Sequence, residues 1–147
     1  MILLKNIFII LNFLAFLFSS EITDNAEKRI LELLPEITTI EWSMYQIPKE
    51  TSKSIQNISK QKFFRNEVNF WEIADNDSLE YYAFLDNAIG KTMPITFLVI
   101  FDNKGSVYNA SIIKYREPYG GEVGNKNWLN QFISYTNKSE YKVGADI

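Results

Sequence analysis

The sequence predicts an α+β fold, in which an antiparallel sheet is flanked by helices. Short runs rich in β-branched and aromatic residues recur along the chain and are separated by turn residues. Residues 93–101 and 106–115 have this composition, and between them Asp-Asn-Lys-Gly forms a turn whose Gly105 is free to adopt positive φ. Apolar residues with helical spacing occur at residues 26–34 and again after Asn125. These observations together predict a hairpin-based sheet with helices around it.

A helix, a strand and a polar segment are expected in the first part of the chain. Asp24 or Asn25 can cap a helix over residues 26–34, whose apolar side chains share one face. Residues 38–47 mix β-branched and aromatic side chains and alternate, which predicts a strand. Residues 49–62 are polar with a sparse apolar stripe, which indicates a surface helix or a mobile segment.

Two more strands precede the hairpin, and a helix follows it. Residues 68–74 are predicted as a strand, and residues 79–88 alternate between a very apolar face and a mixed one. The aromatic residues of the latter strand favour the core or the sheet surface, with stacking on a ligand as the alternative. After the hairpin, Asn125 can cap a helix with one apolar face, made of Trp128, Leu129, Phe132 and Ile133.

Composition narrows the functional classes. The 147 residues correspond to one domain with a short appendage, and the net charge of −3 without a basic block argues against a nucleic-acid partner. The absence of Cys and His excludes thiol nucleophiles, zinc sites with those ligands, disulfides and imidazole bases. The acidic residues Asp75, Asp77 and Asp102 lack the spacing of a calcium loop, so no metal site is predicted. A bound cofactor is the simplest source of demanding chemistry in such a chain.

The first 20 residues resemble a targeting segment. Lys5 precedes a twelve-residue apolar run, residues 7–18, and Ser19 and Ser20 follow it, which is the layout of a secretory signal peptide. As a helix this run is about 18 Å long, well short of the roughly 30 Å hydrocarbon core of a bilayer. The alternative is an uncleaved membrane anchor that extends to Ile2. Both alternatives predict that the domain is exported and is periplasmic, extracellular or membrane-anchored.

The candidate site lies between the hairpin and the last helix, in residues 115–123 (YREPYGGEV). Gly120 and Gly121 allow backbone conformations closed to other residues and let a ligand approach the main chain. Arg116 is a permanently charged planar donor, and Glu117 stands beside it. The helix start just beyond offers free N–H groups, which suit an anion such as phosphate. The alternative is a turn that only ends the strand.

Four motifs carry a resemblance to a known family. They are Gly90-Lys91 before a Pro-led strand, the Asp-x-x-Gly hairpin turn, the YREPYGGEV turn and the Trp-Leu-x-Gln-Phe helix. In this order over residues 88–132 they resemble the FMN-binding domain family, which includes flavin-carrying subunits of the sodium-pumping NADH:quinone reductase and of the Rnf electron-transfer complex. The resemblance implies an α+β fold of the FMN-binding-domain type and extracytoplasmic electron transfer through FMN. It also implies that the cofactor lies near the residues of these motifs, namely Gly90, Lys91, Arg116, Glu117, Gly120 and Gly121.

Family members continue from a Gly-x-Asp-Ile segment to a Ser-Gly-Ala-Thr motif, whose Thr receives FMN through a phosphoester bond made by a flavin transferase. Residues 143–147 match the approach to that motif, and the sequence contains no Ser-Gly-Ala-Thr. We therefore expect residues 21–147 to be an FMN-binding-type domain truncated before the attachment motif, with impaired function. The resemblance implies a flavin transferase and membrane redox proteins as partners, and an electron-carrying domain rather than a stand-alone catalyst. The alternative is a secreted or membrane-anchored, non-enzymatic binding or structural module without cofactor.

Overall fold

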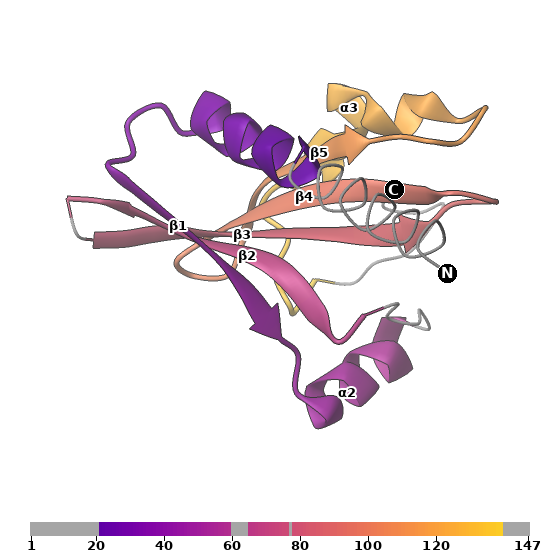
Figure 1. Cartoon of the computed structure of the whole chain (residues 1–147), viewed down its shortest axis with the longest axis horizontal. Helices are drawn as coiled ribbons and strands as arrows, with labels where there is room; N and C mark the ends of the chain where they lie inside the picture. Colours follow the sequence, from indigo (N-terminus) through magenta and orange to yellow (C-terminus); the bar gives the residue numbers. More distant parts are fainter. Residues whose placement is uncertain (1–20, 60–64, 77, 140–147) are drawn as a thin grey trace, which may run out of the picture.

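A single five-stranded antiparallel sheet, with strands in the order β1-β2-β3-β4-β5, forms the centre of the molecule (Figure 1). The computed structural model describes residues 21–59, 65–76 and 78–139. Each strand pairs with the next along the chain, and the strands are β1 Thr39–Gln46, β2 Glu67–Asp75, β3 Ser78–Ile89, β4 Pro94–Asp102 and β5 Val107–Lys114. All five predicted strands are present, which confirms the α+β class with an antiparallel sheet.

Some of the sequence predictions fall outside the described part of the chain. These concern the signal peptide or anchor in residues 1–20, the end of the polar segment at residues 60–62, Asp77, and the match to the family in residues 143–147. Among the residues that are described, no helix has both the length and the apolarity needed to cross a membrane.

The helices flank the sheet as predicted, although the first one begins earlier. The chain is already helical at residue 21 and stays so to residue 33, so Asp24 and Asn25 lie within the helix and the prediction of either as its cap is wrong. The apolar stripe explains the extension, because Ile22 joins Ala26 and Ile30 in packing against the core, one turn ahead of the expected start. The polar segment forms a second helix, α2 Lys49–Ser59, which stands below the sheet in Figure 1.

The predicted C-terminal amphipathic helix is wrong in its length. It is divided into three short pieces, η1 Gly121–Gly124, α3 Lys126–Leu129 and η2 Asn130–Phe132. Asn125 does cap α3, because its side chain accepts a hydrogen bond from the N–H of Asn127 at 2.9 Å. Ile133 has extended backbone and is 38% exposed, so it does not share the apolar face.

Pairing with β5 explains why this helix stops. Ser134 donates its N–H to the carbonyl of Val107 at 2.7 Å, and Val107 donates to the carbonyl of Tyr135 at 2.8 Å. A backbone that pairs with a strand edge cannot continue the helical hydrogen bonds, so the chain leaves the helix after η2. The segment 121–139 thereby folds around the β5 edge of the sheet.

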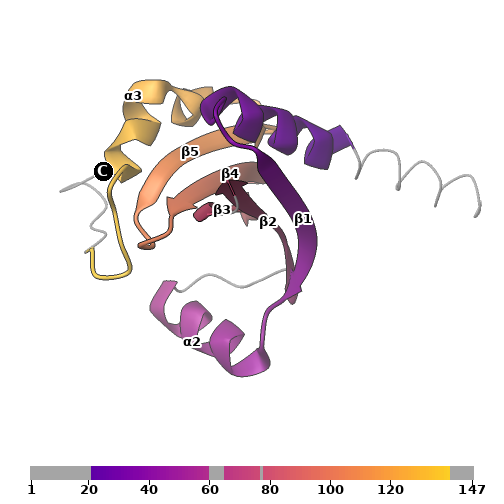
Figure 2. The ribbon, with the colours of Figure 1, turned by 90° about the vertical axis from the view of Figure 1, so that its left-hand side faces the viewer.

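One face of the sheet, which we call the core face, is closed by the N-terminal helix (Figure 2). Side chains of this helix pack on alternate residues of β2, β3 and β4, because successive residues of a strand point to opposite faces. The predicted apolar face of residues 79–88 belongs here, since Ala83 and Leu85 are buried. The buried cluster comprises Ala26, Ile30, Leu34, Trp71, Ile73, Ala83, Leu85, Leu98 and Ile100.

The opposite face, which we call the open face, is aromatic. Phe70 of β2 lies 5.8 Å from the ring of Tyr82 and 5.0 Å from that of Phe84, and Phe84 lies 5.7 Å from Phe101. These side chains are half-buried rather than buried. This confirms a sheet-surface position for Tyr82 and Phe84. The open face consists of Phe70, Tyr82, Phe84, Phe97, Val99 and Phe101.

Candidate functional site

The carboxylate of Glu117 connects the end of β5 to the turn between β3 and β4. Its Oε1 accepts hydrogen bonds from the backbone N–H of Thr92 at 2.6 Å and of Met93 at 2.8 Å. Its Oε2 accepts from the hydroxyl of Thr92 at 2.9 Å. The N–H groups of Met93 and Thr92 hold the pKa of Glu117 below its ordinary value, because these hydrogen bonds favour the charged form. The nine-residue motif is thus fastened to the Gly-Lys motif although 25 residues separate Thr92 from Glu117.

Gly90 makes room for this contact. A Cβ at Gly90 would lie 2.5 Å from Oε1 of Glu117, which is too close, and 3.1 Å from its Cγ, so the Glu117 side chain would have to shift. The backbone N–H of Gly90 donates to the carbonyl of Met93 at 3.1 Å, which closes the turn. Lys91 lies in the same turn and is exposed, and its ammonium makes no ion pair with another described residue.

Arg116 is tied to β4 by one of its three guanidinium nitrogens. Nη1 donates to the carbonyl of Pro94 at 2.8 Å and to the hydroxyl of Thr96 at 2.9 Å. Thr96 is buried and donates in turn to Oδ1 of Asn87 at 2.6 Å. Nε and Nη2 of Arg116 have no partner among the described residues, so these donors remain available to an anion.

The two glycines of the motif differ in what they require. Gly120 has φ +83, in the left-handed region, and a Cβ there would lie 2.9 Å from the hydroxyl of Tyr115. Gly121 has no such φ, and a Cβ there would only touch the Tyr115 ring at 4.0 Å. The Tyr115 hydroxyl donates to the carbonyl of Tyr119, which fixes the loop between them. Desolvation, and then the carboxylates of Glu117 and Glu122, raise the pKa of Tyr115 and keep this donor protonated.

Two of the N–H groups predicted to be free at the start of the last helix have partners within the chain. Asn125 takes the N–H of Asn127 with its side chain, and the N–H of Trp128 bonds to the carbonyl of Asn125 at 3.0 Å. The helix α3 is only four residues long, so its dipole is small. These local bonds weaken the case for a phosphate at this helix end, which stays a prediction.

Sequence reasoning missed an apolar cavity of about 430 Å³ beside these motifs. It lies between the β4–β5 part of the open face and the segment that folds around β5. Trp128 and Phe132 form one wall, with their rings 5.0 Å apart and inclined by 70°. Ala88 and Ile95, which flank the β3–β4 turn, border it too, as does Val123 of the YREPYGGEV motif. The apolar spacing of Trp128 and Phe132 was visible in the sequence, but the hollow beneath them was not.

A second, wider groove of about 560 Å³ lies on the rest of the open face. Its lining includes Tyr45, Phe70, Tyr82, Phe84 and Lys104. The two hollows share Phe101, so they adjoin along β4.

The motif residues lie near the end of the sheet where β3 turns into β4. The cavity extends from there along β4, from Ile95 to Phe101, and none of the six predicted site residues lines it. Glu117 contacts the β3–β4 turn that contains Gly90 and Lys91, and the Arg116 side chain bonds to Pro94 and Thr96 of β4. Gly120 and Gly121 precede Val123 of the cavity wall in the chain. Neither a family model, nor a curated protein, nor a solved structure matches this chain. Within the described ranges, no three His, Cys, Asp or Glu side chains gather in a way that could hold a metal ion.

Proposed function

We propose that this chain is an exported FMN-binding domain that carries electrons, and that the flavin ring occupies the apolar cavity beside Trp128 and Phe132. The observation that supports this most directly is the position of the cavity next to the motifs that carry the resemblance. Val123 of the YREPYGGEV motif lines that cavity, and so do Ala88 and Ile95, which flank the Gly90-Lys91 turn.

The residues present suit the ring of a flavin. A volume of about 430 Å³ falls within the roughly 300–1,000 Å³ of typical small-molecule sites. Aromatic and aliphatic walls favour a flat apolar ring over water, and the T-shaped Trp128–Phe132 pair forms one of these walls. The free nitrogens of Arg116 and the exposed ammonium of Lys91 are cations of the two motifs that suit a phosphate. Bound flavin supplies the redox chemistry, while these side chains orient it and exclude water.

Titration of the purified protein with FMN tests the proposal. We expect weak, reversible binding, seen as a change in flavin fluorescence, and no flavin that survives denaturation. Trp128→Ala should weaken this binding about tenfold, because loss of ring stacking costs roughly 1–3 kcal/mol. The matched control is Trp42→Ala, since Trp42 is half-exposed on β1 and lines neither hollow. Equal affinity in both variants would overturn the assignment of the cavity.

Covalent attachment provides a second test. The sequence contains no Ser-Gly-Ala-Thr, so co-expression with a flavin transferase should leave the 147-residue chain without covalent flavin. A variant with a Ser-Gly-Ala-Thr tail and a following helix after Ile147 should acquire it, and the same tail with Thr changed to Ala should not. Covalent flavin on the unextended chain would reveal an attachment residue outside this motif.

Export is proposed from Lys5 and the apolar run in residues 7–18. A fusion of residues 1–30 to a reporter that works only outside the cytoplasm should be active. A signal from a reporter that works only in the cytoplasm would contradict it.

The second candidate is an exported binding or structural module without cofactor. Its support is that Glu117 and Arg116 already make hydrogen bonds within the chain, which hold the turn and β4. A colourless protein that fails to bind FMN at millimolar concentration, both with and without the added tail, would favour this candidate.

A further inference from the structure

The outer edge of β1 is open, whereas the opposite edge of the sheet is covered. β1 pairs with β2 alone, and seven of its eight residues are exposed. Alternate N–H and C=O groups of a strand point to opposite sides, so half of those in β1 point away from β2. No described residue pairs with this edge, while β5 has residues 134 and 135 bonded to its own edge through Val107.

β1 also lacks the devices that discourage pairing with another chain. Exposed edges are usually blunted by Lys, Pro or a bulge. β1 reads TIEWSMYQ, with no Lys and no Pro, and it follows β2 without a shift in register. Its one charged residue is Glu41. Its exposed side chains include three large hydrophobic ones, Trp42 at 50%, Met44 at 41% and Tyr45 at 48%.

We propose that a second copy of this chain pairs with this edge, β1 against β1 and antiparallel, about a two-fold axis at Ser43. An isologous contact requires a strand that complements itself. In this register Trp42 of one copy faces Met44 of the other, a favourable sulfur–aromatic contact. Glu41 faces Tyr45, so the two carboxylates do not meet across the axis.

This arrangement joins the two sheets into one continuous sheet. A two-fold axis perpendicular to the sheet keeps the core faces of both copies on one side, where Trp42 stands in register with Trp71. Tyr45 lies 6.1 Å from the ring of Phe70, so the aromatic rows of both open faces run toward the same contact. The proposal uses no residue of the cavity, and its outcome is independent of flavin binding.

Cysteine cross-linking tests this contact directly, because the sequence has no native Cys. Residues that face each other across antiparallel strands have Cα atoms about 4.5–5.5 Å apart, within the roughly 4.4–6.8 Å that a disulfide spans. Under mild oxidation of the full chain in the cells that express it, Ser43→Cys should form a disulfide-linked dimer. The matched control is Ser54→Cys, at an exposed position on α2, where links form only by collision.

We expect about tenfold or more dimer for Ser43→Cys than for Ser54→Cys, because pairing raises the local concentration of the two thiols toward millimolar. When Met44→Lys is added to Ser43→Cys, this excess of disulfide-linked dimer should disappear, because a lysine on the edge opposes pairing. When Met44→Leu is added instead, the excess should remain. Equal linking of Ser43→Cys and Ser54→Cys overturns the proposal. A disulfide from residue 43 to a different protein overturns the second copy as the occupant of this edge.

Discussion

The two faces of the sheet are made by alternate residues of the same strands, yet one is closed and the other is not. On the core face Trp71, Ile73 and Ile100 have no exposed surface, because the N-terminal helix lies on them. On the open face Phe70 and Phe84 pack on each other but remain half-buried, and the face contains two hollows. Along each strand, one set of residues is therefore buried in the core, and the alternate set forms a half-buried aromatic surface with two hollows.

The largest expected effect tests this separation with one substitution made on each face of β4. Ile100→Ala should lower the free energy of unfolding by about 2–5 kcal/mol, because it leaves a cavity in a closed core. Ile95→Ala, on the open face beside an existing hollow, should cost no more than about half as much. Urea unfolding of both variants measures the difference. Equal losses would mean that the open face contributes as much stability as the core face.

The core face was predictable from the sequence, because its signals are local. The alternation of residues 79–88 and the turn at Gly105 fix which side chains share a face and which strands are neighbours. The C-terminal helix was mispredicted because its end depends on pairing with Val107, a contact distant in sequence. The hollow under Trp128 has the same origin, since it exists only once the segment 121–139 lies across β4 and β5.

The sequence indicated which residues belong to the candidate site, but not which of them contact one another. Gly90 and Glu117 were both proposed to bind a cofactor, and the structure brings them against each other. Gly90 lets the side chain of Glu117 come close to the backbone. A glycine that makes room for a ligand has the same local sequence pattern, so the sequence alone does not separate the two cases. That these residues also touch FMN stays a prediction.

We expect an intermediate effect on stability from a substitution at the β3–β4 turn, next to the open-face cavity. Glu117→Gln should destabilise the protein at neutral pH, because an amide replaces a carboxylate that accepts from the N–H groups of Met93 and Thr92. The pKa of Glu117 is lowered by folding, so its contribution is complete above the ordinary value of 4.5 and is lost as pH falls below it. The stability gap between wild type and variant, followed by thermal unfolding, should therefore close in acid.

Glu122→Gln is the matched control for this experiment, since the Glu122 carboxylate accepts no hydrogen bond from any described residue. It should leave the unfolding temperature near that of the wild type. A gap for Glu117→Gln that persists below pH 3 would show that the side chain acts through packing rather than through its charge.

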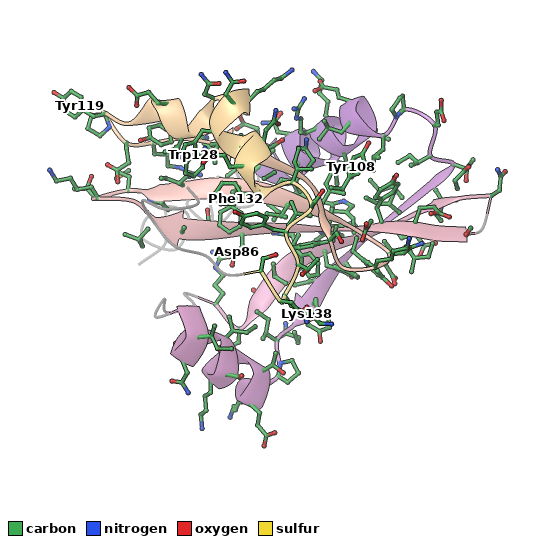
Figure 3. The ribbon with its side chains drawn as sticks, turned by 180° about the vertical axis from the view of Figure 1, so that it is seen from behind. Asp86, Tyr108, Tyr119, Trp128, Phe132 and Lys138 are labelled. Atoms are coloured by element: carbon green, nitrogen blue, oxygen red, sulfur yellow. The ribbon has the colours of Figure 1, made fainter. Side chains whose placement is uncertain are left out.

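The smallest effect concerns Asp86, a carboxyl group on the open face of β3 opposite Phe97 (Figure 3). Burial raises its pKa, and the hydrogen bond from the N–H of Asn87 at 2.7 Å offsets this only in part. As pH rises above the ordinary value of 3.8, the unfolded chain ionises first, so the charged carboxylate costs stability at neutral pH. Asp86→Asn keeps an acceptor for Asn87 and removes that cost.

We expect Asp86→Asn to raise the stability of the protein at pH 7 by less than about 1 kcal/mol, because solvent screens this half-exposed group. The gain should vanish at pH 3, where both forms of residue 86 are neutral, and thermal unfolding at the two pH values measures it. Asp24→Asn, at an exposed position of the N-terminal helix, serves as the control and should change little at either pH. A loss of stability at pH 7 would show that the open face stabilises this negative charge, which would make the face more polar than its aromatic residues indicate.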